Sequence, residues 1–108
     1  MPKLDLSQLF LPPRHLAMLQ DILRQHLNSE ETSVWAYGSR VTGGGHEGSD
    51  LDLVVRNLAN LNSSTPQLAA LKEALTESNL PMLIDLHDWA LLPKEFQQNI
   101  EKGYIEVV

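Results

Sequence analysis

Cysteine is absent from this 108-residue chain, and its absence excludes several kinds of chemistry. Without thiols there is no disulfide scaffold, no thiolate zinc site and no cysteine nucleophile. No apolar run approaches the ~18 to 20 residues of a membrane-spanning helix, and the N-terminal residues do not resemble an export signal. We therefore expect a cytoplasmic protein with no membrane partner.

Basic residues are also scarce. Eight lysines and arginines stand against 14 acidic residues, which gives a formal net charge of -6. Binding to a nucleic-acid backbone depends on basic side chains that release counterions, so a direct nucleic-acid partner is disfavoured. Small phosphate compounds remain open as ligands, because a bound divalent cation reverses the local sign of a carboxylate cluster.

The residues that are present predict one small domain over residues 1–108. With 43% hydrophobic and 20% charged residues, the composition is that of an ordinary globular protein, and the length allows a single core. Apolar spacing predicts helices over residues 16–27, from Thr65-Pro66 to about Asn79, and from Pro93 to Gly103. Short β-rich runs predict strands at 33–37, at 50–55, within 82–89 and at 104–108.

This order of elements predicts an α/β (α+β) fold, in which a mixed β-sheet is covered by helices mainly on one face. Thr65 is expected to cap the second helix. Trp35 and Tyr37 are expected in the core, and Phe96 and Ile100 are expected to face inward from the last helix.

Two aspartates stand one residue apart in the second predicted strand. Alternate side chains of a strand share a face, so Asp50 and Asp52 project together while Leu51 and Leu53 point to the buried side. Like charges held this close disfavour ionisation unless a cation lies between them, and oxygen-only ligands favour magnesium or manganese. The pair therefore predicts a metal site.

A third carboxylate comes from the next predicted strand. Asp85 lies between Ile84 and Leu86, an unfavourable place for a charge that serves no site. With Asp50 and Asp52 it could hold two ions ~3.5 to 4 Å apart, as in phosphoryl-type displacements. Asp88 is the alternative third ligand, because strand register is read poorly from sequence.

The Gly-Ser pair ahead of the aspartates supplies a complementary feature. Gly38 ends the first predicted strand and lets the backbone approach a ligand closely. Ser39 offers a hydroxyl and, if it begins a short helix through Thr42, backbone amides suited to phosphate. The carboxylates and the amides together predict a site for a nucleoside triphosphate.

Taken in order, Gly38-Ser39, Gly43, Ser49-Asp50-Leu51-Asp52 and the later Asp85 resemble the DNA polymerase beta-like nucleotidyltransferase superfamily. The short length and the ending KEFQQNIEKGYIEVV make the chain similar to its minimal nucleotidyltransferase (MNT) branch. The resemblance covers roughly residues 15–108, with the motif core at about 33–88. It implies the nucleotidyltransferase fold, with nucleotide contacts at Gly38, Ser39, Arg40 and Ser49 and catalytic magnesium ligands at Asp50, Asp52 and Asp85.

The resemblance also implies an activity and a partner. We expect a magnesium-dependent enzyme, with two ions and with manganese as an alternative, that transfers AMP from ATP to a hydroxyl. In MNT proteins the acceptor is typically a HEPN-domain toxin, which would make this chain an antitoxin. Two alternatives stay open. One is a stand-alone transferase for a small aminoglycoside-like molecule, with an acceptor pocket that could form across a homodimer, and the other is a non-catalytic binding antitoxin.

Two further features bear on phosphate binding and on contacts with a partner protein. Relatives often carry basic or proline residues where this chain has a glycine-rich loop, so a phosphate contact could be missing at residues 44–48. Apolar residues near the end of the chain are candidates for partner contacts, with core packing of the two aromatic rings as the alternative; they are Trp89, Tyr104, Val107 and Val108.

Overall fold

The computed structural model describes residues 3–28, 30–43 and 48–108. Its centre is a four-stranded sheet in the order β3-β2-β1-β4. Strand β1 (Thr32–Tyr37) runs antiparallel to both β2 (Leu51–Asn57) and β4 (Ile105–Glu106), whereas β2 runs parallel to β3 (Ile84–Asp88). The sheet is therefore mixed, as the sequence predicts.

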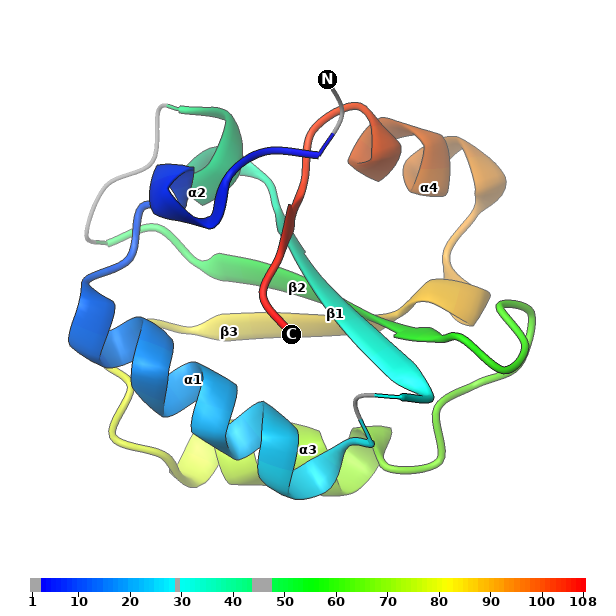
Figure 1. The fold of residues 1–108 in the computed structure, drawn as a ribbon, viewed down its shortest axis with the longest axis horizontal. Coiled ribbons are helices and arrows are strands. Elements are labelled where there is room, and N and C mark those ends of the chain that lie inside the picture. Colours follow the sequence, from blue (N-terminus) through cyan, green and yellow to red (C-terminus); the bar gives the residue numbers. More distant parts are fainter. Residues whose placement is uncertain (1–2, 29, 44–47) are drawn as a thin grey trace.

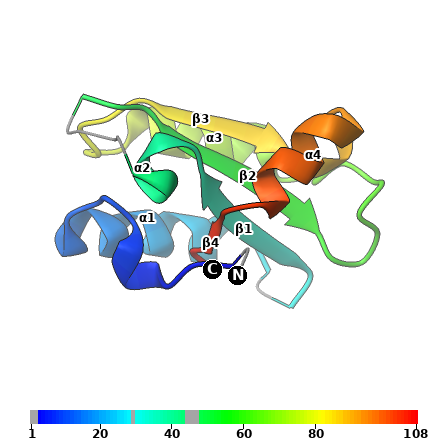
Figure 2. The same ribbon diagram turned by 90° about the horizontal axis from the view of Figure 1, so that it is seen from above.

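Two helices cover one face of the sheet. Helix α1 (Pro13–His26) and helix α3 (Leu68–Glu77) lie below the strands in Figure 1. Figure 2 shows α3 beside β3, and α1 near β4 at the other edge of the sheet. From α1, Gln20 Nε2 donates to the Val107 carbonyl at 2.9 Å. The leucines of both helices meet the alternate strand residues that face them, including Leu19, Leu23, Leu71, Val34, Leu51, Leu53 and Val55. Each such buried side chain contributes roughly 1.5–3 kcal/mol.

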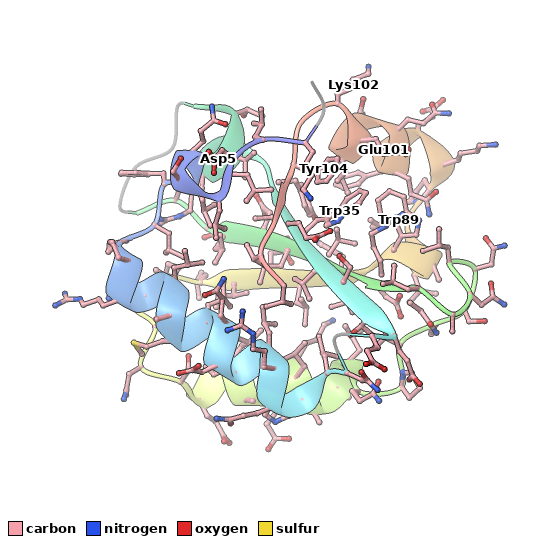
Figure 3. The ribbon with its side chains drawn as sticks, viewed as in Figure 1. Asp5, Trp35, Trp89, Glu101, Lys102 and Tyr104 are labelled. Atoms are coloured by element: carbon pink, nitrogen blue, oxygen red, sulfur yellow. The ribbon has the colours of Figure 1, made fainter. Side chains whose placement is uncertain are left out.

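Helix α4 (Lys94–Glu101) and the 3₁₀ turn η2 (Trp89–Leu91) cover part of the other face. Trp35 stacks on Tyr104 with ring centroids 3.7 Å apart, and Trp89 meets Trp35 edge-on at 5.4 Å (Figure 3). The Arg56 guanidinium lies 3.8 Å from the Trp35 ring and 4.7 Å from the Trp89 ring. This aromatic cluster fixes η2, and with it the start of α4, to the sheet.

This packing corrects the expected partner contacts of Trp89, Tyr104 and Val107, whereas Val108 is partly exposed and its partner contact stays a prediction. Trp89 keeps 6% of its surface exposed and Val107 keeps 2%, and Tyr104 stacks on Trp35. The alternative interpretation holds for Trp89 and Tyr104, because η2 turns the tryptophan back under α4, where it packs against Trp35.

Two details of the helices also differ from expectation. Helix α3 begins at Leu68 with Gln67 in the N-cap position, so Thr65 is not its cap. Instead Thr65 is buried, and its amide donates to Asp88 Oδ2 at 2.9 Å. In α4, Ile100 is buried as expected but Phe96 is 40% exposed.

Two short elements complete the described chain. They are the 3₁₀ turn η1 (Leu6–Gln8) and the one-turn helix α2 (Ser39–Thr42), which has the bounds that the sequence predicts. Within the described residues, no helix combines the length and apolar character needed to cross a membrane.

Candidate active site

Three side chains form a row across the sheet, on the face that α4 covers in part. Tyr37 is the register partner of Asp52 in the antiparallel pair, and Asp52 is the register partner of Asp85 in the parallel pair. Neighbouring strands lie about 4.8 Å apart, so the two carboxylates sit side by side. Asp50 precedes β2, which begins at Leu51 rather than at the expected residue 50.

The turn from β1 into α2 brings the backbone against this row. Gly38 has φ 82° and ψ -158°, a conformation open essentially to glycine alone. A Cβ added at Gly38 would overlap the Asp52 carboxylate oxygen. The glycine ends the strand, as the sequence predicts, and permits a close backbone approach to Asp52. A close approach to a ligand stays a prediction. Ser39 follows as the exposed first residue of α2.

Crowding raises the pKa of Asp52. Partial burial is the largest cause, followed by the negative charges of Asp85 and Asp50, while His87 acts in the opposite direction. Burial, followed by the charges of Asp52 and Asp85, also raises the pKa of the Tyr37 phenol. Burial and the neighbouring carboxylates outweigh His87 and disfavour negative charge at this point, which is the electrostatic setting that a cation relieves.

His87 pairs with the outermost carboxylate of the row. Its Nε2 lies 3.1 Å from Asp85 Oδ2, and both side chains are partly exposed. The two residues alternate on β3 and therefore share a face. The sequence indicates that shared face but not the contact, which depends on the side-chain rotamers.

Asp88 has a different environment from Asp85. It is 3% exposed, accepts from the Thr65 amide at 2.9 Å, and accepts from the Ala90 amide at 3.3 Å as the cap of η2. It lies on the opposite face of β3 from Asp85, because their separation in sequence is odd. Of the two candidates for third carboxylate, Asp85 is the one in the row with Asp52.

The predicted nucleotide contacts Arg40 and Ser49 lie next to each other. Arg40 is 3% exposed, and its Nε donates to the Ser49 carbonyl at 3.0 Å while Nη1 donates to the Phe10 carbonyl at 2.7 Å. These bonds tie α2 to the segment ahead of β2. A phosphate contact by either residue stays a prediction. The glycine-rich loop at residues 44–48, where a phosphate contact could be missing, lies outside the described residues at 44–47.

The donor set fits a hard divalent cation in its chemistry. Within the described ranges, no group of three or more acidic or histidine side chains is already gathered closely enough to enclose a metal ion. Magnesium, however, is commonly held by one or two carboxylates together with substrate phosphates. Asp52 and Asp85 supply such carboxylates, and the assignment of Asp50, Asp52 and Asp85 as ligands stays a prediction.

Comparison with known proteins decides the family. The family model for polymerase beta nucleotidyltransferases matches residues 18–108. The chain belongs to this nucleotidyltransferase family. A protein of Haemophilus influenzae (strain ATCC 51907 / DSM 11121 / KW20 / Rd) named "Probable protein adenylyltransferase MntA" is 38% identical over 101 residues, which cover 94% of this chain and 85% of that protein. This nucleotidyltransferase is thus a member of the minimal branch, as the sequence motifs indicate.

One part of the site region is missed by the sequence motifs. Helix α4 of this nucleotidyltransferase forms, with Tyr37 and Gly38, a pocket beside the carboxylate row. Phe96 contributes an exposed ring whose centroid lies 5.8 Å from that of Tyr37. The helical spacing of Phe96 and Ile100 indicates a shared face, but it does not show that this face borders the site.

Proposed function

We propose that this nucleotidyltransferase transfers AMP from ATP to a hydroxyl group of a partner protein. The observation that carries the proposal is the row of Asp52 and Asp85 in direct register beside the Gly38 turn. The printed name of the Haemophilus influenzae protein, a protein adenylyltransferase, supports the choice of AMP and of a protein acceptor.

The chemistry is a displacement at the α-phosphorus of ATP. The acceptor oxygen forms a bond to that phosphorus, the bond to the bridging oxygen of the β-phosphate breaks, and pyrophosphate leaves. Asp50, Asp52 and Asp85 would hold magnesium, which would neutralise charge on the attacking and leaving oxygens. Asp85 would accept the proton of the acceptor hydroxyl, a role supported by its position beside Asp52 and by His87 Nε2, which lies 3.1 Å from its Oδ2.

The Gly38-Ser39 turn would position the triphosphate. Phosphoryl transfer depends on positioning and on electrostatic stabilisation more than on covalent participation of the protein. Because Gly38 abuts the Asp52 carboxylate, phosphates bound along α2 would lie next to the metal ligands. In this proposal the Gly38-Ser39 turn positions the triphosphate, and the carboxylates of β2 and β3 compensate its charge only through the magnesium that they would hold.

The partner is proposed to be a HEPN-type protein, with this chain as its modifying antitoxin. The support is the MNT resemblance of the sequence together with the MntA relative. A stand-alone transferase for a small hydroxyl compound and a non-catalytic binding antitoxin are the competing functions. The three functions predict different outcomes: a modified partner protein, a modified small molecule, or no product at all.

Expression together with the neighbouring gene of the native operon tests the proposal. The co-purified partner is incubated with ATP and magnesium, and its intact mass is measured. The proposal expects one added AMP on the partner, absent with Asp85→Asn and present with Asp21→Asn, an exposed carboxylate on α1. A stable complex with no mass change would support simple occlusion, and the absence of any complex would support a small-molecule acceptor.

A further inference from the structure

A pocket lies beside the carboxylate row, on the same face of the sheet. It has a volume of about 270 Å³, and α4 forms one of its walls opposite the end of β1. Residues that line it and matter here are Tyr37, Gly38, Phe96, Asn99, Ile100 and Lys102. Neither the sequence motifs nor the family match assigns a role to it.

The pocket is continuous with the predicted phosphate site. Gly38 lines the pocket and also abuts the Asp52 carboxylate. Tyr37 lines the pocket and is the register partner of Asp52. A ligand whose phosphates lie at Asp52 can therefore extend past the Gly38 turn into the pocket without crossing another element.

The pocket suits a flat aromatic ring. Tyr37 and Ile100 are buried and form its apolar floor, while Phe96 stands at the rim with 40% of its surface exposed. The Phe96 ring is nearly perpendicular to that of Tyr37, at 88°. An exposed aromatic face over an apolar floor gains both stacking and burial when a nucleobase enters.

One polar side chain in the pocket can select the base. Phe96, Asn99 and Ile100 share a face of α4 because they are three and four residues apart. The Asn99 amide carries a donor and an acceptor, the pattern that pairs with N6 and N7 of adenine. Lys102 would instead suit guanine, but its place just after the last turn of α4 is explained by the helix dipole.

We propose that this pocket binds the adenine base of ATP, with Phe96 stacking on the ring and Asn99 selecting adenine over guanine. This inference rests on the proposed function, which puts the phosphates of ATP beside the Gly38-Ser39 turn. It goes beyond that function because it assigns base recognition to α4, outside the Gly-Ser and aspartate motifs. It requires only nucleotide binding, so it can be tested without an acceptor.

Calorimetric titrations with magnesium present test the pocket. The probes are ATP, GTP and inorganic tripolyphosphate, which has the phosphates but no base. The variants are Phe96→Ala and Asn99→Ala, and the control is Gln98→Ala, an exposed neighbour on α4 that does not line the pocket. Urea unfolding of each variant checks that the fold is intact.

We expect Phe96→Ala to weaken ATP binding roughly tenfold, as the loss of one stacked base implies, and to leave tripolyphosphate binding unchanged. Asn99→Ala is expected to reduce the preference for ATP over GTP by a similar factor, and Gln98→Ala to match the unsubstituted protein. Wild-type ATP affinity in Phe96→Ala, an equal loss of tripolyphosphate binding, or an unchanged base preference in Asn99→Ala would overturn the inference. None of these outcomes depends on whether AMP reaches a protein acceptor.

Discussion

At the scale of single residues, we expect the site to depend on one glycine as much as on its carboxylates. Gly38 and Gly43 both have φ above 80° and extended ψ values, in a region that side chains other than glycine rarely enter. They differ in what surrounds them. A Cβ at Gly38 would overlap Asp52, whereas a Cβ at Gly43 would meet no described atom within 4 Å.

Gly38→Ala and Gly43→Ala therefore form a matched pair. Both changes carry backbone strain of roughly 1–3 kcal/mol, but only Gly38→Ala also displaces the Asp52 carboxylate. We expect similar losses of unfolding free energy in urea, or a larger loss for Gly38→Ala, and a loss of nucleotide transfer for Gly38→Ala alone. Equal transfer activity in the two variants would show that the close approach to Asp52 has no functional role.

At the scale of elements, β3 separates two aspartates with different tasks. Asp85 faces Asp52 from one side of the strand, and Asp88 holds the Thr65 segment and the η2 turn from the other. The alternation of side chains along β3 makes this division possible. A shift of one residue in register would exchange the two faces.

Substitution of the two aspartates separates these tasks. Asp88→Ala leaves the buried Thr65 amide unpaired and removes the η2 cap, so we expect a loss of roughly 2–4 kcal/mol of unfolding free energy. Asp85→Asn changes a partly exposed side chain, so the unfolding free energy of this variant should lie within about 0.5 kcal/mol of that of the unsubstituted protein. The variant should nevertheless lose transfer activity. Urea denaturation and a transfer assay of both variants check this, and a stable but inactive Asp88→Ala would reverse the assignment.

The elements also show how far the sequence predicts this molecule. Local patterns place α1, β1, β2 and β3, because apolar spacing reports the buried face of each element directly. The missed features all depend on contacts between distant segments. The sequence predicts that Thr65 caps a helix. In the structure its amide instead donates a hydrogen bond to Asp88, which lies 23 residues later. Helical spacing predicts that Phe96 is a core residue. In the structure, the position of α4 leaves the Phe96 ring exposed at the rim of a pocket.

The candidate site also has a part that the sequence predicts and a part that it does not. Asp52 and Asp85 stand out as charges within apolar strands, and their pairing follows once β2 and β3 are adjacent and parallel. The pocket has no comparable signal, because Asn99 is an unremarkable polar residue in an amphipathic helix. The position of α4 relative to the end of β1 places Asn99 in the same pocket as Tyr37 and Gly38.

At the scale of the whole molecule, ligand binding should be coupled to stability. The metal-free site holds mutually repelling carboxylates, and the pKa of Asp52 is raised by burial and by Asp85 and Asp50. If a cation and a triphosphate bind at this site as proposed, each would offset the charge of the other, so neither should bind well alone. Ligands that bind only the folded state stabilise it by mass action.

We therefore expect a thermal shift only when magnesium and ATP are both present. At about 100 times the dissociation constant, the gain in unfolding free energy should be ~2.7 kcal/mol. Differential scanning fluorimetry with magnesium alone, ATP in EDTA, and both together measures the shift. An equal shift with ATP in EDTA would contradict the metal-linked site.

Radiolabelled ATP provides the test of whether the carboxylate row catalyses AMP transfer to a protein. Asp52→Asn removes one crowded charge, so the variant should fold at least as stably as the unsubstituted protein in EDTA. With the co-purified partner and magnesium, label at the α-phosphate of ATP should become attached to the partner, whereas label at the γ-phosphate should not. The Asp52→Asn variant should transfer neither label. Attachment of the γ-label, or α-label transfer by Asp52→Asn at an undiminished rate, would contradict the account.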